Sequence, residues 1–400
     1  MRKRGIGLLG SILAFCSLAA ILSCDCLCGQ KTAVAITPPP LAVPAKPAAI
    51  EPGKPWHFAV SGDSRNCGDV VMPAIAQGAA HDQAQFYWHL GDLRAIYDFD
   101  EDILQDAKMK GQQHLTISAY EKMAWTDFRQ SQTVPFGGIP FFLGIGNHEA
   151  VPGLNSREQF SKEFADFLDR PELKSQREKD AGKGPVAPPK TYFHWVLDGV
   201  DFIYLDNATP DQFDADQLKW VEGAIASDAK SDSTIHTVVV GMHAALPNSI
   251  SAGHSMNQMK DEGKSGVQVY KDLLELSKKK KVYVLASHSH YYMEDIYNTQ
   301  FWQSNGGVLP GWIAGTAGAR RYPLPEPNAA KAAKTNVYGY LLGTVTPSGQ
   351  EAGTVQFEFK QLAEKDVPAA IVHQYSQEFV HWCFVENTDA KPGSPKTPDH

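Results

Sequence analysis

The chain has 400 residues, of which 43% are hydrophobic and 20% are charged, an ordinary composition for a globular protein. This length allows one large domain or two smaller ones, with an ample core. Asp and Glu number 45 against 37 Lys and Arg, which gives a net charge of −8. Nucleic-acid backbones are held by basic surfaces, so this acidic balance argues against a nucleic-acid polymer as the main partner.

Residues 1–28 have the pattern of an export leader. Three basic residues at positions 2–4 precede an apolar run that ends at Ser23, as in a secretory signal peptide. Cleavage before Cys24 would follow a loose lipobox, ILSC, and would allow membrane attachment through a lipid on Cys24. Ordinary signal-peptidase cleavage a few residues later, or an uncleaved apolar anchor, remains open. We expect an exported protein, either periplasmic or at the cell surface, as a lipoprotein if Cys24 is modified.

A linker and a tail are expected on either side of the globular part. Residues 29–54 are rich in Pro and Ala and are predicted to form a tether that buries little surface. The globular domain is predicted to span 55–387, and residues 388–400 are expected to be a disordered tail. Cys67 and Cys383 are the two cysteines of the globular part. An oxidising compartment would permit a disulfide between them, but the sequence leaves open whether they pair.

The first half of the globular part alternates short apolar runs with helical patterns, which is typical of an α/β protein. Its first apolar run, FAVSGD, ends at Asp63. The polar, Pro-containing residues 170–190 are predicted to form a flexible surface loop. The other expected elements are a helix at 71–80, a strand at 85–90, a helix at 118–132 and a strand at 140–145.

The second half continues this alternation. The segments YFHWVLDG and VDFIYLDN are predicted to form a β-hairpin around Asp198-Gly199, a common turn pair. A helix is expected at 211–226. Two further strands, TVVVGM and VYVLAS, have a helix between them and are each followed by histidine. The last strands are expected at 338–344 and 354–359.

Residues with metal-binding side chains follow five of the apolar runs. In an α/β protein, functional groups gather beyond the carboxyl ends of the strands, so these five segments are expected to form one site. Each residue alone is better explained as a turn former, a helix cap or an ordinary histidine. One shared site is a better explanation than five such separate ones in this order. Carboxylate, amide and imidazole ligands suit zinc, manganese and iron. The residues are Asp63, Asp92, Asn147 with His148, His243, and His288 with His290.

These segments resemble the calcineurin-like metallophosphoesterases, a family that includes purple acid phosphatases, nucleotidases and phosphodiesterases. The resemblance covers roughly Trp56 to Phe359. It implies a four-layer αββα sandwich with two mixed β-sheets, and a centre of two divalent or trivalent ions of iron, zinc or manganese. One ion would be held by Asp63, Asp92 and His290, and the other by Asp92, Asn147, His243 and His288.

The same resemblance implies an activity. The protein would hydrolyse small phosphomonoesters or phosphodiesters by attack of a hydroxide that bridges the two ions. His148 would be the catalytic residue, either stabilising the transition state or protonating the leaving oxygen. Two alternatives remain open: a nucleotide or cyclic-nucleotide hydrolase, and a catalytically inactive, anchored binding protein of the same fold.

The chain departs from the family pattern at two places. The family often has His or Gly two residues after the first aspartate, whereas this chain has Arg65. A guanidinium is not expected to bind a cation, so Arg65 would either contact a substrate phosphate or form a structural ion pair. Ala95 stands where purple acid phosphatases have a tyrosine ligand, and Tyr97 is not assigned as a ligand. His254, in a polar stretch after His243, is a second candidate substrate contact.

Overall fold

The computed structural model describes residues 40–112, 114–208, 212–251, 253–256, 263–325 and 332–389. The predicted leader at 1–28, with the lipid site at Cys24, lies outside these residues, as does the predicted tail beyond residue 389. Within the part of the chain that is described, no helix is both long enough and apolar enough to cross a membrane.

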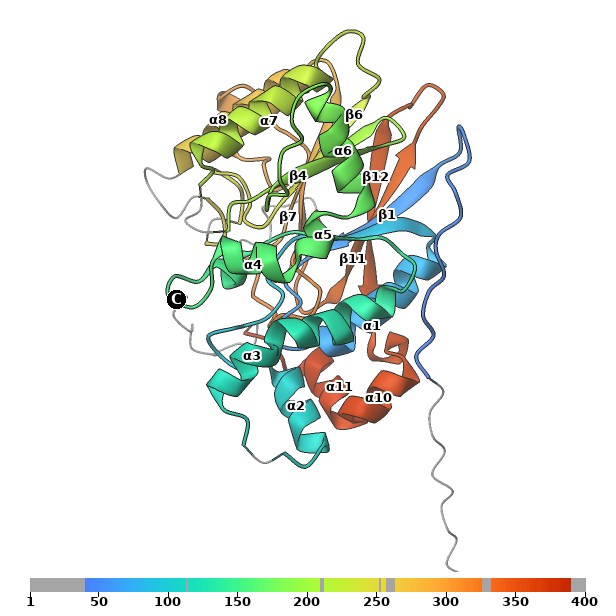
Figure 1. The fold of residues 1–400 in the computed structure, drawn as a ribbon, viewed down its shortest axis with the longest axis vertical. Helices are drawn as coiled ribbons and strands as arrows, with labels where there is room; N and C mark the ends of the chain where they lie inside the picture. The colour runs from blue at the N-terminus through green and yellow to red at the C-terminus, as the bar shows by residue number, and fades with distance from the viewer. Residues whose placement is uncertain are drawn as a thin grey trace, which may run out of the picture. The chain divides into compact units, whose positions relative to one another are not determined.

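Two mixed β-sheets form the centre of the fold (Figure 1). The first sheet has the described strand order β12-β11-β1-β2-β3. Its strands β1, β2 and β3 are parallel, and β11 is antiparallel to both neighbours. The strands are β1 (Trp56–Ser61), β2 (Ala84–His89), β3 (Phe141–Leu143), β11 (Tyr338–Thr346) and β12 (Thr354–Leu362).

The second sheet has the described order β10-β8-β9-β7-β6-β5-β4. In it, β5, β6, β7 and β9 are parallel, and β4 and β8 are antiparallel to their neighbours. The strands are β4 (Phe193–Leu197), β5 (Val200–Leu205), β6 (Thr237–Met242), β7 (Lys281–Ala286), β8 (Tyr292–Glu294), β9 (Gly311–Ala314) and β10 (Ala333–Lys334).

Successive side chains of a strand point to opposite faces of a sheet, and in the second sheet both faces are buried. Phe202 and Tyr204 of β5 lie in the core shared with the first sheet, whereas Ile203 and Leu205 lie in a core with α7 and α8. Figure 1 shows α7 and α8 together beside the second sheet. The predicted αββα sandwich is confirmed. The helices are α1 (Gly68–His81), α2 (Glu101–Met109), α3 (Ile117–Asp127), α4 (Arg157–Glu163), α5 (Ala165–Leu168), α6 (Pro171–Ala181), α7 (Ala215–Asp228), α8 (Gly263–Leu276), α9 (Gln300–Ser304), α10 (Ala369–Tyr375) and α11 (Gln377–Val385).

Aromatic rings fill the space between the two sheets. The rings of Phe142 and Trp195 stack with centroids 3.8 Å apart, and Trp88 packs edge-on against Trp195 at 5.1 Å. All three side chains are buried. Such rings bury large apolar areas, so this layer is a main source of the stability that holds the sheets face to face.

Most predicted elements agree with the structure. The helices expected at 71–80 and 211–226 correspond to α1 and α7, and β4 and β5 form the expected hairpin. Asp198 and Gly199 have φ angles of 46° and 78°, as the tight turn requires. The helix expected at 118–132 is divided, because α3 ends at Asp127 and a π-helix follows at Phe128–Thr133.

The prediction of a loop at 170–190 is wrong for its first part, because Pro171–Ala181 form α6, whereas residues 182–190 form no helix or strand. Pro171 lies in the first turn, where its missing N–H costs no hydrogen bond, and most of the following residues are good helix formers. Leu173 and Gln176 are the buried residues of α6. The helix therefore lacks the apolar stripe by which an amphipathic helix is recognised in a sequence.

The described part of the predicted tether lies against the globular domain. Residues 40–51 form no helix or strand, but Leu41 and Ile50 pack against the main hydrophobic core. The backbone N–H of Gly138 donates to the Pro44 carbonyl over 2.9 Å. This stretch therefore buries more surface than the sequence predicts.

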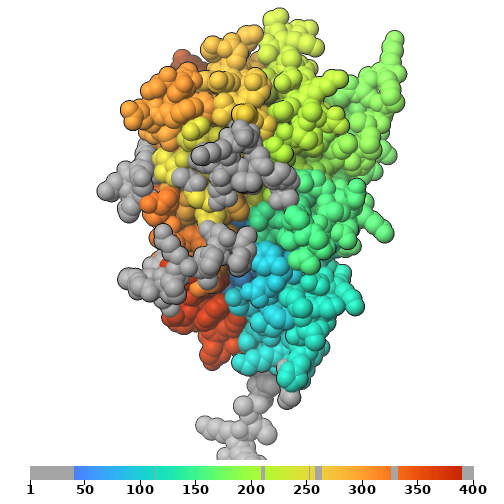
Figure 2. Space-filling model, turned by 90° about the vertical axis from the view of Figure 1, so that its left-hand side faces the viewer, coloured from blue at the N-terminus to red at the C-terminus, as the bar shows by residue number. Residues whose placement is uncertain are grey.

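The disulfide that the sequence left open joins Cys67 to Cys383. Cys67 precedes α1, Cys383 lies in α11, and both side chains are fully buried. Nearby, Gln105 of α2 donates to the Tyr375 carbonyl of α10 over 2.8 Å. In Figure 2, residues near 100 and near 375 accordingly lie side by side. The C-terminal helices are thus attached covalently beside the first sheet.

Removing the disulfide should destabilise the protein. The bond closes a loop across 316 residues, so the Cys67→Ala, Cys383→Ala double variant is expected to lose roughly 2–5 kcal/mol of unfolding free energy. Urea denaturation with and without reductant measures this loss. Reductant should shift the wild-type midpoint and leave the double variant unchanged, and equal midpoints for both proteins would contradict the expectation.

His194 ties α6 to the second sheet. Its Nε2 lies 2.8 Å from Asp180 of α6, and its Nδ1 lies 2.9 Å from Asp201 of β5. Burial alone would lower the pKa of His194, but the two carboxylates outweigh burial and raise it to about 10. His194 is therefore an imidazolium in the folded protein at neutral pH.

The His194→Gln variant should be less stable by roughly 1–2 kcal/mol at pH 6, a modest value because Asp180 is partly exposed to water. The folded pKa lies above the unfolded value of 6.5, so this contribution is complete below pH 6.5 and is lost by about pH 10. Urea denaturation of both proteins between these pH values should show the gap closing. A gap that widens with pH would exclude the charged pair as its cause.

Candidate metal centre

Five strand ends meet at one edge of the two sheets. Strands β1, β2 and β3 end shortly before Asp63, Asp92 and Asn147, and β6 and β7 end shortly before His243 and His288. Asp63, Asp92 and His288 have φ angles of 61°, 60° and 65°, a left-handed conformation that is uncommon outside glycine. Such positions gather at functional sites, where surrounding contacts hold them.

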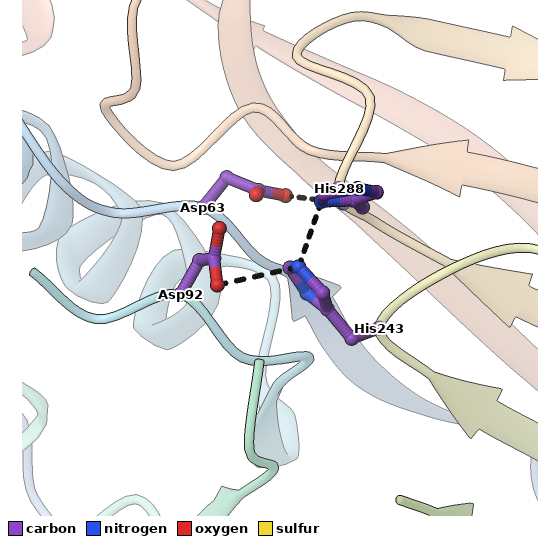
Figure 3. A group of neighbouring side chains, drawn as sticks. All are labelled: Asp63, Asp92, His243 and His288. Atoms are coloured by element: carbon purple, nitrogen blue, oxygen red, sulfur yellow. Dashed lines mark hydrogen bonds and ion pairs between the residues drawn. The ribbon is translucent and has the colours of Figure 1, made fainter. Parts of the chain in front are cut away.

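Four of the predicted metal ligands form a compact group. Figure 3 shows Asp63, Asp92, His243 and His288 pointing toward one another from different strand ends. One ligand atom from each lies within 4.8 Å of the others. Asp63, Asp92 and His243 are buried, and His288 is partly buried. This group could hold a metal ion.

The atoms around His243 have the arrangement that a cation requires. His243 Nδ1 lies 3.0 Å from the Leu90 carbonyl, to which it donates, so Nε2 is the nitrogen left to bind a metal ion or a second proton. That Nε2 lies 2.9 Å from Asn147 Oδ1, 3.0 Å from His288 Nδ1 and 3.3 Å from Asp92 Oδ1. Lone-pair atoms so close together repel one another unless a proton or metal ion lies between them. A single transition-metal ion fits this set of four ligands.

Without a metal ion, a proton on His243 Nε2 takes this place. Burial would lower the pKa of His243, but Asp92 and Asp63 outweigh it and raise the pKa to about 9. Burial would raise the pKa of Asp92, but His243, His148 and Arg65 hold it well below its usual range. Asp92 is therefore a carboxylate, and the negative potential around His243 attracts positive charge.

Glu149 is a positioning residue to which the sequence analysis gave no role. Its carboxylate accepts hydrogen bonds from the backbone N–H groups of Asp92 at 2.9 Å, Leu93 at 2.8 Å and Gly146 at 2.8 Å. These bonds fix the loop that carries Asp92 relative to the loop that carries Asn147. The available signal was the position of Glu149 directly after Asn147-His148. Burial and Asp92 raise the pKa of Glu149 to about 7.

The remaining ligand set, Asp63, Asp92 and His290, fits a metal ion less well. Asp63 Oδ2 accepts the backbone N–H of His288 at 2.7 Å, and Asp63 Oδ1 lies 3.3 Å from His290 Nε2. His290 Nδ1 donates to the Arg320 carbonyl over 2.6 Å, which leaves the lone pair on Nε2. That lone pair faces Arg65 Nη2 at 3.1 Å. A guanidinium nitrogen thus already occupies the direction in which His290 would bind a metal.

His148 lies beside the candidate metal ligands in a neutral form. Its Nδ1 donates to the Ala95 carbonyl over 2.7 Å, and its Nε2 faces Arg65 Nη1 and lies 3.1 Å from the Tyr97 hydroxyl. Burial lowers the pKa of His148 to about 3, and the charge of Arg65 acts in the same direction. Tyr97, which was not assigned as a metal ligand, stacks on the His148 ring with centroids 4.7 Å apart.

His254 and Tyr322 lie over the histidines of the centre. The His254 ring lies 5.1 Å from that of His288 and stacks with Tyr322 at 4.9 Å. Tyr322 in turn stacks on His290 at 4.0 Å. The structure therefore brings both candidate substrate contacts, Arg65 and His254, to the candidate metal centre. Tyr322 was not predicted from the sequence as a site residue.

The comparisons with known proteins agree with this geometry at the level of the fold. No protein-family model and no curated protein matches the sequence. Among solved structures, a purple acid phosphatase from yellow lupin (Lupinus luteus) seeds matches with a TM-score of 0.51 and 14% identity. The chain has a metallophosphoesterase fold. The match covers 78% of this chain and 53% of the lupin protein, so the chain spans about half the length of that relative.

Two further solved structures match less closely. PhoD matches with a TM-score of 0.46 and 13% identity, over 86% of this chain and 78% of PhoD. A 5′-nucleotidase from Candida albicans matches with a TM-score of 0.40 and 11% identity, over 86% of this chain and 58% of that protein.

Measurements of metal content should distinguish a candidate metal ligand, His243, from His148, which lies beside the candidate ligands. The His243→Ala variant should lose most of its bound metal, because His243 contributes the lone pair at the centre of the group. The His148→Ala variant should keep its metal, because His148 Nε2 faces Arg65 instead. Metal analysis of the purified proteins tests both, with His81→Ala as a control, since 89% of that side chain is exposed. Loss of metal from His148→Ala would contradict this assignment.

Proposed function

We propose that the protein is an exported, metal-dependent hydrolase of small phosphomonoesters or phosphodiesters. The observation that carries this proposal is the convergence of lone-pair atoms from Asp92, Asn147, His243 and His288 in a metallophosphoesterase fold. A metal ion held there would acidify water and neutralise charge on a phosphoryl group. Iron, zinc and manganese all suit these ligands.

Arg65 is the proposed phosphate-binding side chain. Its guanidinium lies beside Asp92 and His148 at the centre, with 13% of the side chain exposed. Guanidinium groups donate two parallel hydrogen bonds to phosphoryl oxygens. Arg65 would therefore orient the phosphoryl group against the metal, and His254 would contact the part of the substrate that lies over His288.

His148 is the proposed catalytic residue. In the free protein its low pKa makes it neutral, so it holds no proton for a leaving group at neutral pH. A phosphate dianion bound by Arg65 would raise the pKa of His148, since a nearby negative charge favours the imidazolium. His148 would then stabilise the transition state or protonate the leaving oxygen.

Two features support export. Residues 1–28 have the pattern of a signal peptide, and the Cys67–Cys383 disulfide is of a kind that persists in oxidising compartments. The proposed location is the periplasm or the cell surface, with membrane attachment if Cys24 carries a lipid.

A non-catalytic binding protein of the same fold is the second candidate. The observation that favours it is Arg65, which fills the space beside His148 and His290. A nucleotide or cyclic-nucleotide hydrolase differs from the main proposal only in its substrate. Activity measurements on a panel of substrates distinguish these functions.

The purified protein, supplied with manganese, zinc or iron, is expected to hydrolyse p-nitrophenyl phosphate or bis(p-nitrophenyl) phosphate. The His148→Ala variant should lower kcat by about 100-fold or more, the usual contribution of acid–base catalysis. The His81→Ala control should retain full activity. Metal binding without turnover of aryl esters, nucleotides or cyclic nucleotides would exclude the hydrolase and favour the binding protein.

A further inference from the structure

Arg65 contacts several protein side chains, which is unusual for an arginine that binds substrate in a site without substrate. Its Nη2 lies 3.1 Å from His290 Nε2 and 3.4 Å from the Tyr322 hydroxyl, and its Nη1 contacts His148 Nε2. Its Nε lies 4.0 Å from Asp92 Oδ2. The guanidinium is therefore enclosed by the side chains that would surround an ion between Asp63, Asp92 and His290.

The hydrogen bonds made by Nδ1 of two histidines leave Nε2 of each available to accept from Arg65. His290 and His148 each donate from Nδ1 to a backbone carbonyl, over 2.6 Å to Arg320 and 2.7 Å to Ala95. Each therefore directs the lone pair of Nε2 toward the guanidinium, which has only donors. His290 cannot use the same lone pair for Arg65 and for a metal ion. Binding a second ion would require Arg65 to leave.

The buried carboxylates also fit the arginine. Asp63 Oδ1 and Asp92 Oδ2 are buried and have no hydrogen-bond partner, so positive charge beside them is favourable. One divalent ion and Arg65 carry one positive charge more than these two carboxylates. Two divalent ions and Arg65 would carry three more, and such excess charge in a buried site is costly without an anion.

The backbone on both sides of Arg65 is held in place, so its position is not that of a free surface side chain. Ser64 N donates to the Asp92 carbonyl over 2.9 Å, and Asn66 N donates to Asp100 Oδ1 over 2.6 Å. Cys67, in the disulfide, donates from its N–H to the Arg65 carbonyl over 2.8 Å. The guanidinium is thus delivered to the centre by a fixed loop.

We propose that the centre holds one metal ion, bound by Asp92, Asn147, His243 and His288 with Asp63 nearby, and that the Arg65 guanidinium takes the place of a second cation. This inference rests on the proposed function, because it requires the first ion. In place of the expected two metal ions, the centre would contain one exchangeable metal ion and the guanidinium of Arg65. A substrate phosphoryl group would then lie between the ion and the guanidinium.

The test counts bound ions in the full chain and in two variants. Titration calorimetry with Mn²⁺, together with metal analysis, should give one ion per wild-type chain. The Arg65→His variant should bind two ions, because it frees the His290 lone pair and adds an imidazole. The Arg65→Lys variant keeps the positive charge and should bind one, as should Arg129→His, an arginine paired with Asp166 in α5.

Electron paramagnetic resonance of the Mn²⁺-loaded proteins provides a readout that does not depend on turnover. Wild type should give the spectrum of an isolated Mn²⁺ ion, and Arg65→His should give that of an exchange-coupled pair. Retention of the first ion in Arg65→His shows that the variant is folded.

The outcomes separate this inference from the proposed function. Two ions in the wild type, or one ion in a folded Arg65→His variant, would overturn the inference and leave the metal-dependent hydrolase intact. A wild-type protein that binds no ion under any condition would overturn both.

Discussion

The close approach of the two sheets at their carboxyl edge is the constraint on which the candidate metal centre depends. A Cβ atom added at Gly62 would lie 2.6 Å from Ser287 Oγ, and one added at Gly241 would lie 2.4 Å from the Trp88 ring. Glycine at these positions lets the strand ends meet. His243 Nδ1 and Ser287 Oγ then both donate to the Leu90 carbonyl over 3.0 Å, which joins the second sheet to the first.

That close approach creates an electrostatic requirement. It buries the carboxylates of Asp63 and Asp92 beside several imidazole lone pairs, far from water. Unpaired buried charge is costly, so the surrounding protein must provide cations or bind them. Arg65 supplies one positive charge from the chain, and the His243 group is arranged to take another from solution. Glu149 holds the loop that carries Asp92 in a fixed position relative to the loop that carries Asn147.

The convergence of the candidate ligands could be predicted because the pattern that marks each of them is local. Asp63, Asp92, His243 and His288 each follow an apolar run directly, and strand ends of an α/β fold converge. The contacts around these residues could not be predicted, because they join positions that lie far apart in the sequence. The contacts of Arg65 join it to residues 83 and 225 positions away, and the disulfide joins cysteines 316 positions apart. Helix α6 was missed for a different reason, since polar contacts anchor it more than apolar ones.

Because of the disulfide, the loop beside the candidate centre is completed only after a residue much later in the chain has been synthesised. Cys67 lies two residues after Arg65, but its partner, Cys383, lies 316 residues further along the chain than Cys67. The loop that carries Arg65 therefore lacks its covalent support until the chain has been synthesised through Cys383 and the two thiols have met an oxidant. Assembly of the candidate centre thus depends on synthesis of Cys383 and on the compartment. A chain that stops before Cys383, or a reduced one, would carry the candidate ligands without the bond that fixes their neighbouring arginine.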